Sequence, residues 1–421
     1  MSAKKSRALA ACCLSSIFGI SHTAWAQPDE LTLPGLLTEV RQHSPLLQAR
    51  QAVERAARTR RAQTTLWEDP MVMAELWQVP LSLERLPLMV TFKQPLPWIG
   101  TALAKKRQAD AEASFENAVS QTQVRLVLLS ATRAYFSYLQ AHRSLLVLQQ
   151  NRVVSQGLLA SVDARFRVGK AEFQELLEAQ AALTSLETAV LDVEQEKQSA
   201  EQQIFALLGK TQSSPLGVPV TLPERSPLSP VSPGPPLEEL LNRAQKERSE
   251  IQSAERKGSV LRHRLQTMRT APEFALWGSY MKSLRGDMDQ AFSVGVQSNI
   301  PVFSGLRLTA AQKEVAALLQ QNELETDQLR ADVAAEVRVA YLRHNTALRH
   351  HFLHHHELSP LSKQAVAAAQ AGVAAGRIPL SVLFSAIDRH LQHRLAQEKY
   401  LAQIGQTRAE LDFAVGVEFI P

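Results

Sequence analysis

The feature that most constrains the fold is a long stretch that no helix breaker interrupts. Between Leu103 and Phe166 the sequence contains no proline, and Gly157 is its only glycine. The stretch is rich in alanine, leucine, glutamine and arginine, so at 1.5 Å per residue it predicts a helix of roughly 95 Å. A rod of this length cannot fold into a globular core. We therefore expect a mainly α-helical protein whose long helices pack side by side.

Short motifs of the first half recur in the same order in the second half, at offsets that rise only from 205 to 207 residues. Ordered repetition of this kind predicts two structural repeats, 27–210 and 237–421. Each repeat is expected to contain a helix, a hairpin, a long helix, a glycine-marked reversal and a return helix. The paired motifs are HSPLLQA (43–49) with RSEIQSA (248–254), QPLPWIG (94–100) with SNIPVFSG (298–305), RAYF (133–136) with VAYL (339–342), RVGKAEFQELLEAQ (167–180) with AAGRIPLSVLFSAI (374–387), and ALLG (206–209) with FAVG (413–416).

The segment 211–236 between the repeats contains eight prolines in 26 residues. Proline cannot donate a backbone hydrogen bond and fixes its own φ, so neither a helix nor a central strand is expected there. We interpret this segment as an extended crossover linker.

Each repeat also contains an expected β-hairpin, at 71–94 and at 273–299. Apolar and polar residues alternate in both, as in the run from Phe292 to Gln297, which predicts strands with one apolar and one polar face. Their length suits tilted membrane strands, although small hairpins on a soluble helical rod would give the same pattern. Proline and glycine mark each junction of strand and helix, at Pro97, Gly100, Pro301 and Gly305.

Four strands cannot close a barrel, and an open sheet edge in a bilayer leaves backbone groups without hydrogen-bond partners. A membrane interpretation therefore requires several chains to combine their strands. Three copies would supply twelve strands, which lies within the range of outer-membrane barrels.

The N-terminus has the features of an export signal. A basic leader, a short apolar stretch and a small-x-small pattern predict a signal peptide over 1–26. Both cysteines lie within it, so no disulfide or thiol site is expected in the remaining chain. Its removal takes the formal charge from +5 to +2, which gives no reason to expect nucleic acid as a partner. A lipobox-like pattern ends at Cys12 but has few apolar residues before it.

The order of these elements resembles the TolC-type outer-membrane efflux family. RFRVGKAEFQELLEAQAAL (165–183) resembles that family's periplasmic-tip motif, and IPVFSGLRLTAA (300–311) resembles its strand-to-helix junction. The resemblance covers essentially the whole chain after the leader. It implies a homotrimer with a twelve-stranded barrel in outer-membrane lipid of a Gram-negative bacterium, above a long periplasmic α-helical tunnel. It also implies a periplasmic adaptor protein and an inner-membrane efflux pump as partners, and no cofactor.

The two glycine reversals are the expected tips of the helical rods, since glycine readily adopts the positive φ of such a turn. The resemblance implies that the tips contact the adaptor, while helix-turn residues of no further function would look the same. The acidic gate of some relatives is absent, because the matching positions are Val382 and Ser385. The first repeat offers three glutamates near one face as pore-lining candidates instead. The tip residues are Val168, Gly169, Lys170, Ala375, Gly376 and Arg377, and the glutamates are Glu172, Glu175 and Glu178.

A histidine tract, LRHHFLHHHELSP (348–360), is the one pattern that suggests metal chemistry. His350 with His354 and His351 with His355 are i, i+4 pairs, each able to bind Zn²⁺, Cu²⁺ or Ni²⁺ on a helix, with His356 adjacent. A solvated polar helix face is the alternative. His390 and His393 could join the cluster only if the return helix passes at the same height.

No motif of a catalytic site is found, so the protein is not expected to be an enzyme. We predict a passive outer-membrane exit duct of a tripartite efflux system that exports heavy-metal cations. The alternatives are a duct for drugs or other organic solutes, a type I secretion duct, and a soluble periplasmic histidine-rich metal-binding coiled-coil protein.

Overall fold

The computed structural model describes residues 30–65, 68–76, 87–96, 99–211, 216–220, 235–268, 273–284, 289–299 and 304–417. The expected signal peptide, Pro97 and Pro301 lie outside these residues, as does most of the proline-rich linker.

The same order of elements occurs twice along the chain. In the first half the elements are β1 (Glu30–Leu31), α1 (Leu33–His43), α2 (Pro45–Thr65), β2 (Met71–Leu76), β3 (Pro87–Leu96), α3 (Ile99–Arg167) and α4 (Phe173–Leu208). After β4 (Val218–Pro219), the second half consists of α5 (Leu237–Glu247), α6 (Ser249–Thr267), β5 (Glu273–Ser283), β6 (Ala291–Asn299), α7 (Ser304–Phe352), the π-helical turn η1 (Leu353–Leu358), α8 (Ser359–Ala374) and α9 (Leu380–Val415).

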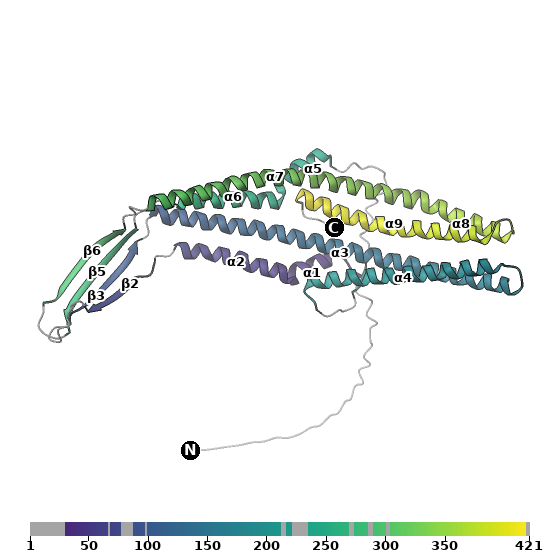
Figure 1. Ribbon diagram of the computed structural model, residues 1–421, viewed down its shortest axis with the longest axis horizontal. Helices are drawn as coiled ribbons and strands as arrows, with labels where there is room; N and C mark the ends of the chain where they lie inside the picture. Colours follow the sequence, from purple (N-terminus) through teal and green to yellow (C-terminus); the bar gives the residue numbers. More distant parts are fainter. Residues whose placement is uncertain are drawn as a thin grey trace, which may run out of the picture.

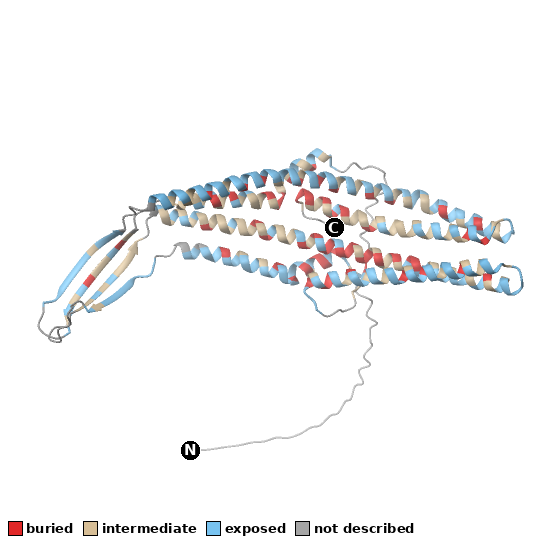
Figure 2. Ribbon diagram, in the orientation of Figure 1, coloured by how far each residue is buried: buried red, intermediate tan, exposed pale blue. Residues whose placement is uncertain are grey.

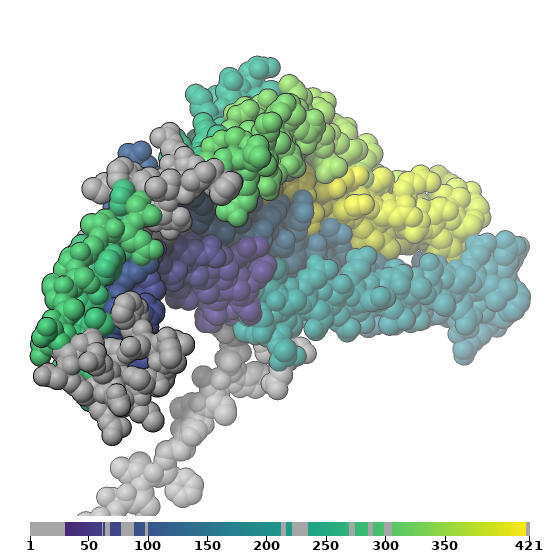
Figure 3. Space-filling model, turned by 60° about the vertical axis from the view of Figure 1, so that its left-hand side comes forward, coloured from purple at the N-terminus to yellow at the C-terminus, as the bar shows by residue number. Residues whose placement is uncertain are grey.

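The molecule is elongated, with the sheet at one end and the two helical reversals at the other (Figure 1). The long expected helix is confirmed as α3, which has 69 residues, and it contacts helices of both halves. The return helices α4 and α9 have 36 residues each. Figure 3 shows the sheet and the far helical hairpins at opposite ends of the body.

The amphipathic helix expected at the start of each half is broken in two, which corrects the sequence interpretation of one continuous helix. Ser44 adopts an extended conformation (φ −61°, ψ 118°) because the residue before a proline, here Pro45, disfavours the helical region. Arg248 adopts the same conformation (φ −66°, ψ 120°) without a following proline.

The buried Arg248 side chain accounts for the second break. Its guanidinium donates to Glu250 at 2.8 Å, to Glu336 at 2.8 Å and to the carbonyl of Phe413 at 2.7 Å. It also lies 4.3 Å from the centroid of the Phe413 ring. These contacts hold Arg248 against both α7 and α9, and a buried charge needs such partners. The chain therefore changes direction at Arg248, between α5 and α6.

The four long strands form one antiparallel sheet in the order β2-β3-β5-β6. Strands β3 and β5 pair over ten residues, from Pro87↔Ser283 to Leu96↔Phe274, and so join the two halves. Among the described strands, β2 and β6 each have one edge without a partner. Both expected hairpins are confirmed.

One face of the sheet is apolar and exposed. Along one register row, Val72, Phe92 and Val294 lie side by side with Gly278 between the last two. Val72 is 68% exposed and Val294 61% exposed, although both are large apolar side chains. The opposite face is mixed: it carries Trp277 and several methionines beside polar residues, and Ser279 and Ser293 form a 2.6 Å hydrogen bond there. Figure 2 shows the outer strands β2 and β6 as mostly exposed and the central strands β3 and β5 as mostly intermediate or buried. An exposed apolar face of this size indicates a contact with lipid or protein.

The described part of the linker is held against α3 by two buried tyrosines. Strand β4 pairs in parallel with β1. The Tyr135 hydroxyl lies 3.1 Å from the carbonyl of Leu31 and also bonds the carbonyl of Val220, while the Tyr138 hydroxyl donates to Gly217 at 3.3 Å. Burial raises the pKa of Tyr135 to about 12, so its hydroxyl stays a donor at neutral pH.

The second rod is two residues longer than the first. The offset is 205 at Gly100/Gly305, 206 at Tyr135/Tyr341 and 207 at the two tip glycines. The second extra residue lies between Tyr341 and Gly376, and the turn η1 lies within this interval. A π turn encloses one residue more than an α turn, so η1 accommodates that residue without breaking the rod. Among the described helices, none combines the length and apolarity that crossing a bilayer requires.

Glycine in α9 sets the distance between α9 and α3. A Cβ atom at Gly405 would collide with the ring of Phe136, whereas a Cβ at the exposed Gly157 would meet open space. We expect Gly405→Ala to destabilise the protein by about 1 to 3 kcal/mol through overpacking. The control Gly157→Ala should be stabilising by up to about 1 kcal/mol, because alanine favours the helix. Thermal unfolding of the purified variants tests this, and equal midpoints for both would contradict it.

Candidate functional site

The first tip is a tight reversal between α3 and α4. Gly169 has φ 70°, and its N–H donates to the carbonyl of Phe166 at 2.9 Å. The N–H of Lys170 donates to the carbonyl of Arg165 at 2.8 Å. These two bonds form a Schellman motif, which requires a left-handed residue and therefore favours glycine. Val168, which is 68% exposed, projects from this turn.

The second tip, between α8 and α9, has the same geometry. Gly376 has φ 67° and donates to Val373 at 3.0 Å, and Arg377 donates to the carbonyl of Gly372 at 2.9 Å. Ala375, Gly376 and Arg377 are exposed, as are Val168, Gly169 and Lys170. Each tip therefore presents its glycine between a small apolar residue and a cation.

The two tips are held together by one apolar cluster. Val162 of α3 and Ala179 of α4 pack with Ala369, Leu380 and Leu383 of the second half. The four helices that carry the tips therefore form a single end rather than two independent hairpins. This end can present both sets of tip residues to one partner surface.

The three candidate glutamates lie on the first turns of α4. Glu172 is the N-cap residue, and Glu175 is in the first turn, where the helix dipole favours a negative charge. One carboxylate oxygen of Glu175 is buried without a hydrogen-bond partner, and Glu178 accepts from Gln174 at 3.0 Å. On α9, Val382 is exposed and the hydroxyl of Ser385 donates to Ser381 at 3.0 Å.

The histidine tract forms the π-helical turn η1 and its flanks. The N–H of Ser359 donates to the carbonyl of His354, five residues earlier. Pro360 follows directly and cannot donate the helical bond that would otherwise reach His356. The turn therefore lies where a proline and an extra residue both disturb the α-helical pattern, and π turns of this kind are frequent at functional sites.

Several of these histidines face α9 at the same height. The ring of His350 stacks on Tyr400 at 4.8 Å between centroids, and the ring of His354 lies 5.2 Å from Tyr400 and 5.5 Å from His393. His390 is hydrogen-bonded to Ser362 at 2.8 Å. The sequence left open whether His390 and His393 could reach the tract. The structure brings His393 beside it, whereas the partner of His390 is Ser362 of α8, beyond the tract.

The i, i+4 pairs differ in the structure. The rings of His351 and His355 stack at 5.6 Å, whereas His350 and His354 both pack on Tyr400. Among the described residues, no group of three or more histidine, cysteine or acidic side chains is already arranged around a metal-sized space. Burial, followed by the nearby His393, lowers the pKa of His354, which favours the neutral ring that metals bind.

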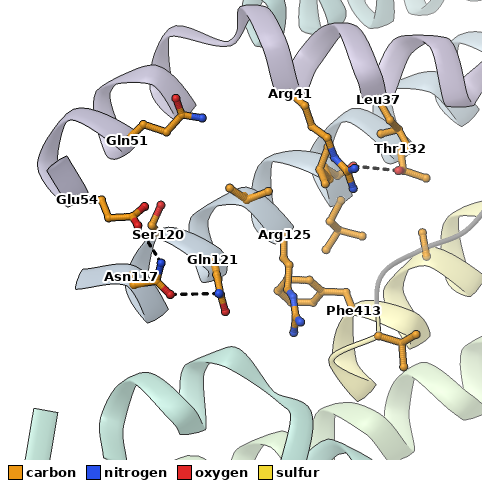
Figure 4. Close-up of a pocket in the computed structure, with 15 residues that line it drawn as sticks. Leu37, Arg41, Gln51, Glu54, Asn117, Ser120, Gln121, Arg125, Thr132 and Phe413 are labelled. Atoms are coloured by element: carbon orange, nitrogen blue, oxygen red, sulfur yellow. Dashed lines mark hydrogen bonds between the residues drawn. The ribbon is translucent and has the colours of Figure 1, made fainter. Parts of the chain in front are cut away.

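A groove of about 380 Å³ lies midway along the helical body (Figure 4). Its wall combines apolar side chains with a short hydrogen-bond chain in which Asn117 donates to Glu54 at 2.9 Å and accepts from Gln121 at 3.2 Å. Arg125 and Phe413 come from different halves of the protein. No sequence pattern indicates this groove, because its lining residues are scattered over four segments.

The junctions of sheet and rod are described only in part. Gly100 and Gly305 are the second residues of α3 and α7. Both therefore lie where the chain leaves the sheet for a long helix, as the sequence predicts.

Solved structures share this fold along almost the entire chain, whereas no family model and no curated protein matches the sequence. CusC, a transmembrane channel, has a TM-score of 0.77 at 16% identity, with 96% of this chain and 97% of that chain covered. The outer membrane protein VceC of Vibrio cholerae has a TM-score of 0.74 at 16% identity, with 92% and 97% covered. The open outer membrane channel MtrE of Neisseria gonorrhoeae has a TM-score of 0.74 at 14% identity, with 91% and 89% covered.

The chain therefore has the fold of these membrane channel proteins, with mainly helical repeats and a small sheet. The class of fold that the sequence predicts is confirmed.

His344, a half-buried residue that precedes the tract in the sequence, makes stability depend on pH. The His344 ring accepts or donates a 3.1 Å hydrogen bond with Thr407, and burial, helped by Arg408, lowers its pKa to about 4. The unfolded chain protonates His344 more readily than the folded chain does. The contribution of the neutral His344 ring to the free energy of unfolding is therefore fully present above the ordinary pKa near 6.5. It falls as the pH drops from there toward 4, by about 3 kcal/mol per chain at most.

We expect His344→Gln to reduce this loss, since glutamine can bond Thr407 but does not titrate. Thermal unfolding midpoints of the wild type and the variant at pH 7.5 and pH 5 measure the effect. An unchanged acid shift in the variant would refute the role of His344.

Proposed function

We propose that this protein is the outer-membrane channel of a tripartite efflux system in a Gram-negative bacterium. The observation that carries the proposal is a four-stranded sheet with an exposed apolar face, joined directly to helical rods in a channel fold. Lipid would cover the apolar face, and the rods would extend through the periplasm. The chain would act as a passive duct, with transport driven by an inner-membrane pump.

The unpaired edges of β2 and β6 support a homotrimer. In lipid, each unpaired strand edge leaves backbone donors and acceptors without partners, which costs several kcal/mol per group. Pairing β6 of one copy with β2 of the next would satisfy both edges at once. Three copies would then close a barrel of twelve strands.

The tip end would meet the periplasmic adaptor. Val168, Lys170 and Arg377 are exposed there and lie on one jointly packed end of the molecule. An apolar side chain flanked by cations suits a partner surface that combines apolar and acidic residues.

The transported solute is proposed to be a heavy-metal cation. In a threefold arrangement, Glu172, Glu175 and Glu178 would place a negative ring near the aperture, which favours cations and disfavours anions. Drugs or other organic solutes are the nearest alternative, followed by type I secretion substrates. A soluble periplasmic metal-binding protein is the alternative of another class, and the exposed apolar sheet face disfavours it.

Neighbouring positions on β6 provide a matched test of membrane location. Val296 is on the exposed apolar face and Gln297 is on the opposite face. We expect Val296→Glu to reduce heat-modifiable trimer in the outer-membrane fraction, because a charge on the lipid face is destabilising; an acidic residue costs less than the about 2 to 4 kcal/mol of lysine or arginine at the bilayer midplane. The control Gln297→Glu should assemble normally. Release of the wild-type protein with the soluble periplasmic proteins on osmotic shock would contradict the proposed location in the outer membrane.

The cargo is tested by deleting the gene and measuring growth. We expect tolerance to cobalt, zinc, cadmium or copper salts to fall several-fold and to return with the wild-type gene. Tolerance to dyes and detergents should be unchanged. Unchanged tolerance to metals with reduced tolerance to dyes and detergents would refute the metal proposal and favour organic solutes as the cargo.

A further inference from the structure

We propose that His354 of η1 and His393 of α9 bind one divalent transition-metal ion, which clamps the π turn to the return helix. His350 completes the site by rotating its ring from the face of Tyr400. This ion would be a resident part of the wall, and the proposal depends on the fold but not on which solute the duct carries.

The distance between the two rings fits a shared ion. Their centroids are 5.5 Å apart and the ring planes are inclined by 55°. Zinc lies about 2 Å from each ligating nitrogen, so two imidazoles on one ion have centroids within about 6 Å of each other. The two residues belong to different helices, so the ion would link segments that are 39 residues apart in the sequence.

The environment of His354 leaves a nitrogen available for the ion. Its Nδ1 atom is buried and has no hydrogen-bond partner in the structure. Buried polar atoms are nearly always paired, so an unpaired one needs an explanation, and an unfilled ligand position supplies it. Tyr400 encloses one side, with its ring 5.2 Å from His354 and 4.8 Å from His350.

The other histidines of this region are occupied by other contacts. Nδ1 of His355 is hydrogen-bonded to Gln397 at 2.8 Å, and a nitrogen of His390 is bonded to Ser362 at 2.8 Å. His356 packs against Phe352 at 4.8 Å. His351 stacks on His355 at 5.6 Å between centroids. These contacts set the remaining histidines apart from the pair formed by His354 and His393.

The ligand chemistry selects the class of metal. Two or three neutral imidazoles with no thiolate and no carboxylate suit Zn²⁺, Ni²⁺ or Cu²⁺. They do not suit Ca²⁺ or Mg²⁺, which require oxygen ligands. A π turn is a natural position for the site, since its wider helix projects His354 toward α9.

Calorimetric titration of the purified full-length protein with ZnCl₂ tests the clamp. We expect one ion per chain in the wild type, and affinity at least tenfold lower in His354→Ala and His393→Ala. The controls His356→Ala and His390→Ala change the same two helices and should bind as the wild type does. Zinc should also raise the thermal midpoint of the wild type but not of His393→Ala.

Three results would overturn the clamp: no zinc binding by the wild type, unaltered binding by His393→Ala, or equal losses in His356→Ala. His393→Gln, a polar replacement of similar size, repeats the test if the alanine variant folds poorly. Outer-membrane fractionation of the same variants separates the two proposals. Failed zinc binding with intact trimers refutes only the clamp, whereas zinc binding by a protein outside the membrane refutes only the duct.

Discussion

The pairing of β3 with β5 is the constraint on which the rest of the structure depends. These ten residue pairs join the two halves in one sheet, and they place the starts of α3 and α7 at the same end. Both rods then extend in the same direction, and the return helix α9 packs between them. The backbone hydrogen bonds of the sheet therefore fix the relative height at which the two rods begin.

This shared origin explains why a small difference in length matters. The two rods begin in register at the sheet but differ by two residues before they reach their tips. The tips nevertheless pack in one apolar cluster. Part of the difference is taken up by η1, whose wider turn lets the second rod keep its direction and still end level with the first. The histidine tract lies in and beside this turn.

Both the helical body and the sheet expose surfaces that other molecules could contact. The body buries its core in four clusters along its length, whereas the sheet exposes large apolar side chains such as Phe292, which is 73% exposed. The sheet edges, the apolar face and the exposed tips lie at positions that a single copy cannot cover. These exposed features support the proposal that the chain is one part of a larger assembly.

The sequence by itself determined the rods, the hairpins and the tips, because each is set by local rules: an absence of proline, alternation of apolar residues, and glycine where φ must be positive. It also indicated the two-repeat plan. Only the tertiary structure decided the break at Arg248, whose cause is a buried charge paired with residues far along the chain. The same holds for the approach of His393 to His354, since the height at which α9 passes the tract depends on the tip, the π turn and the packing of four helices together.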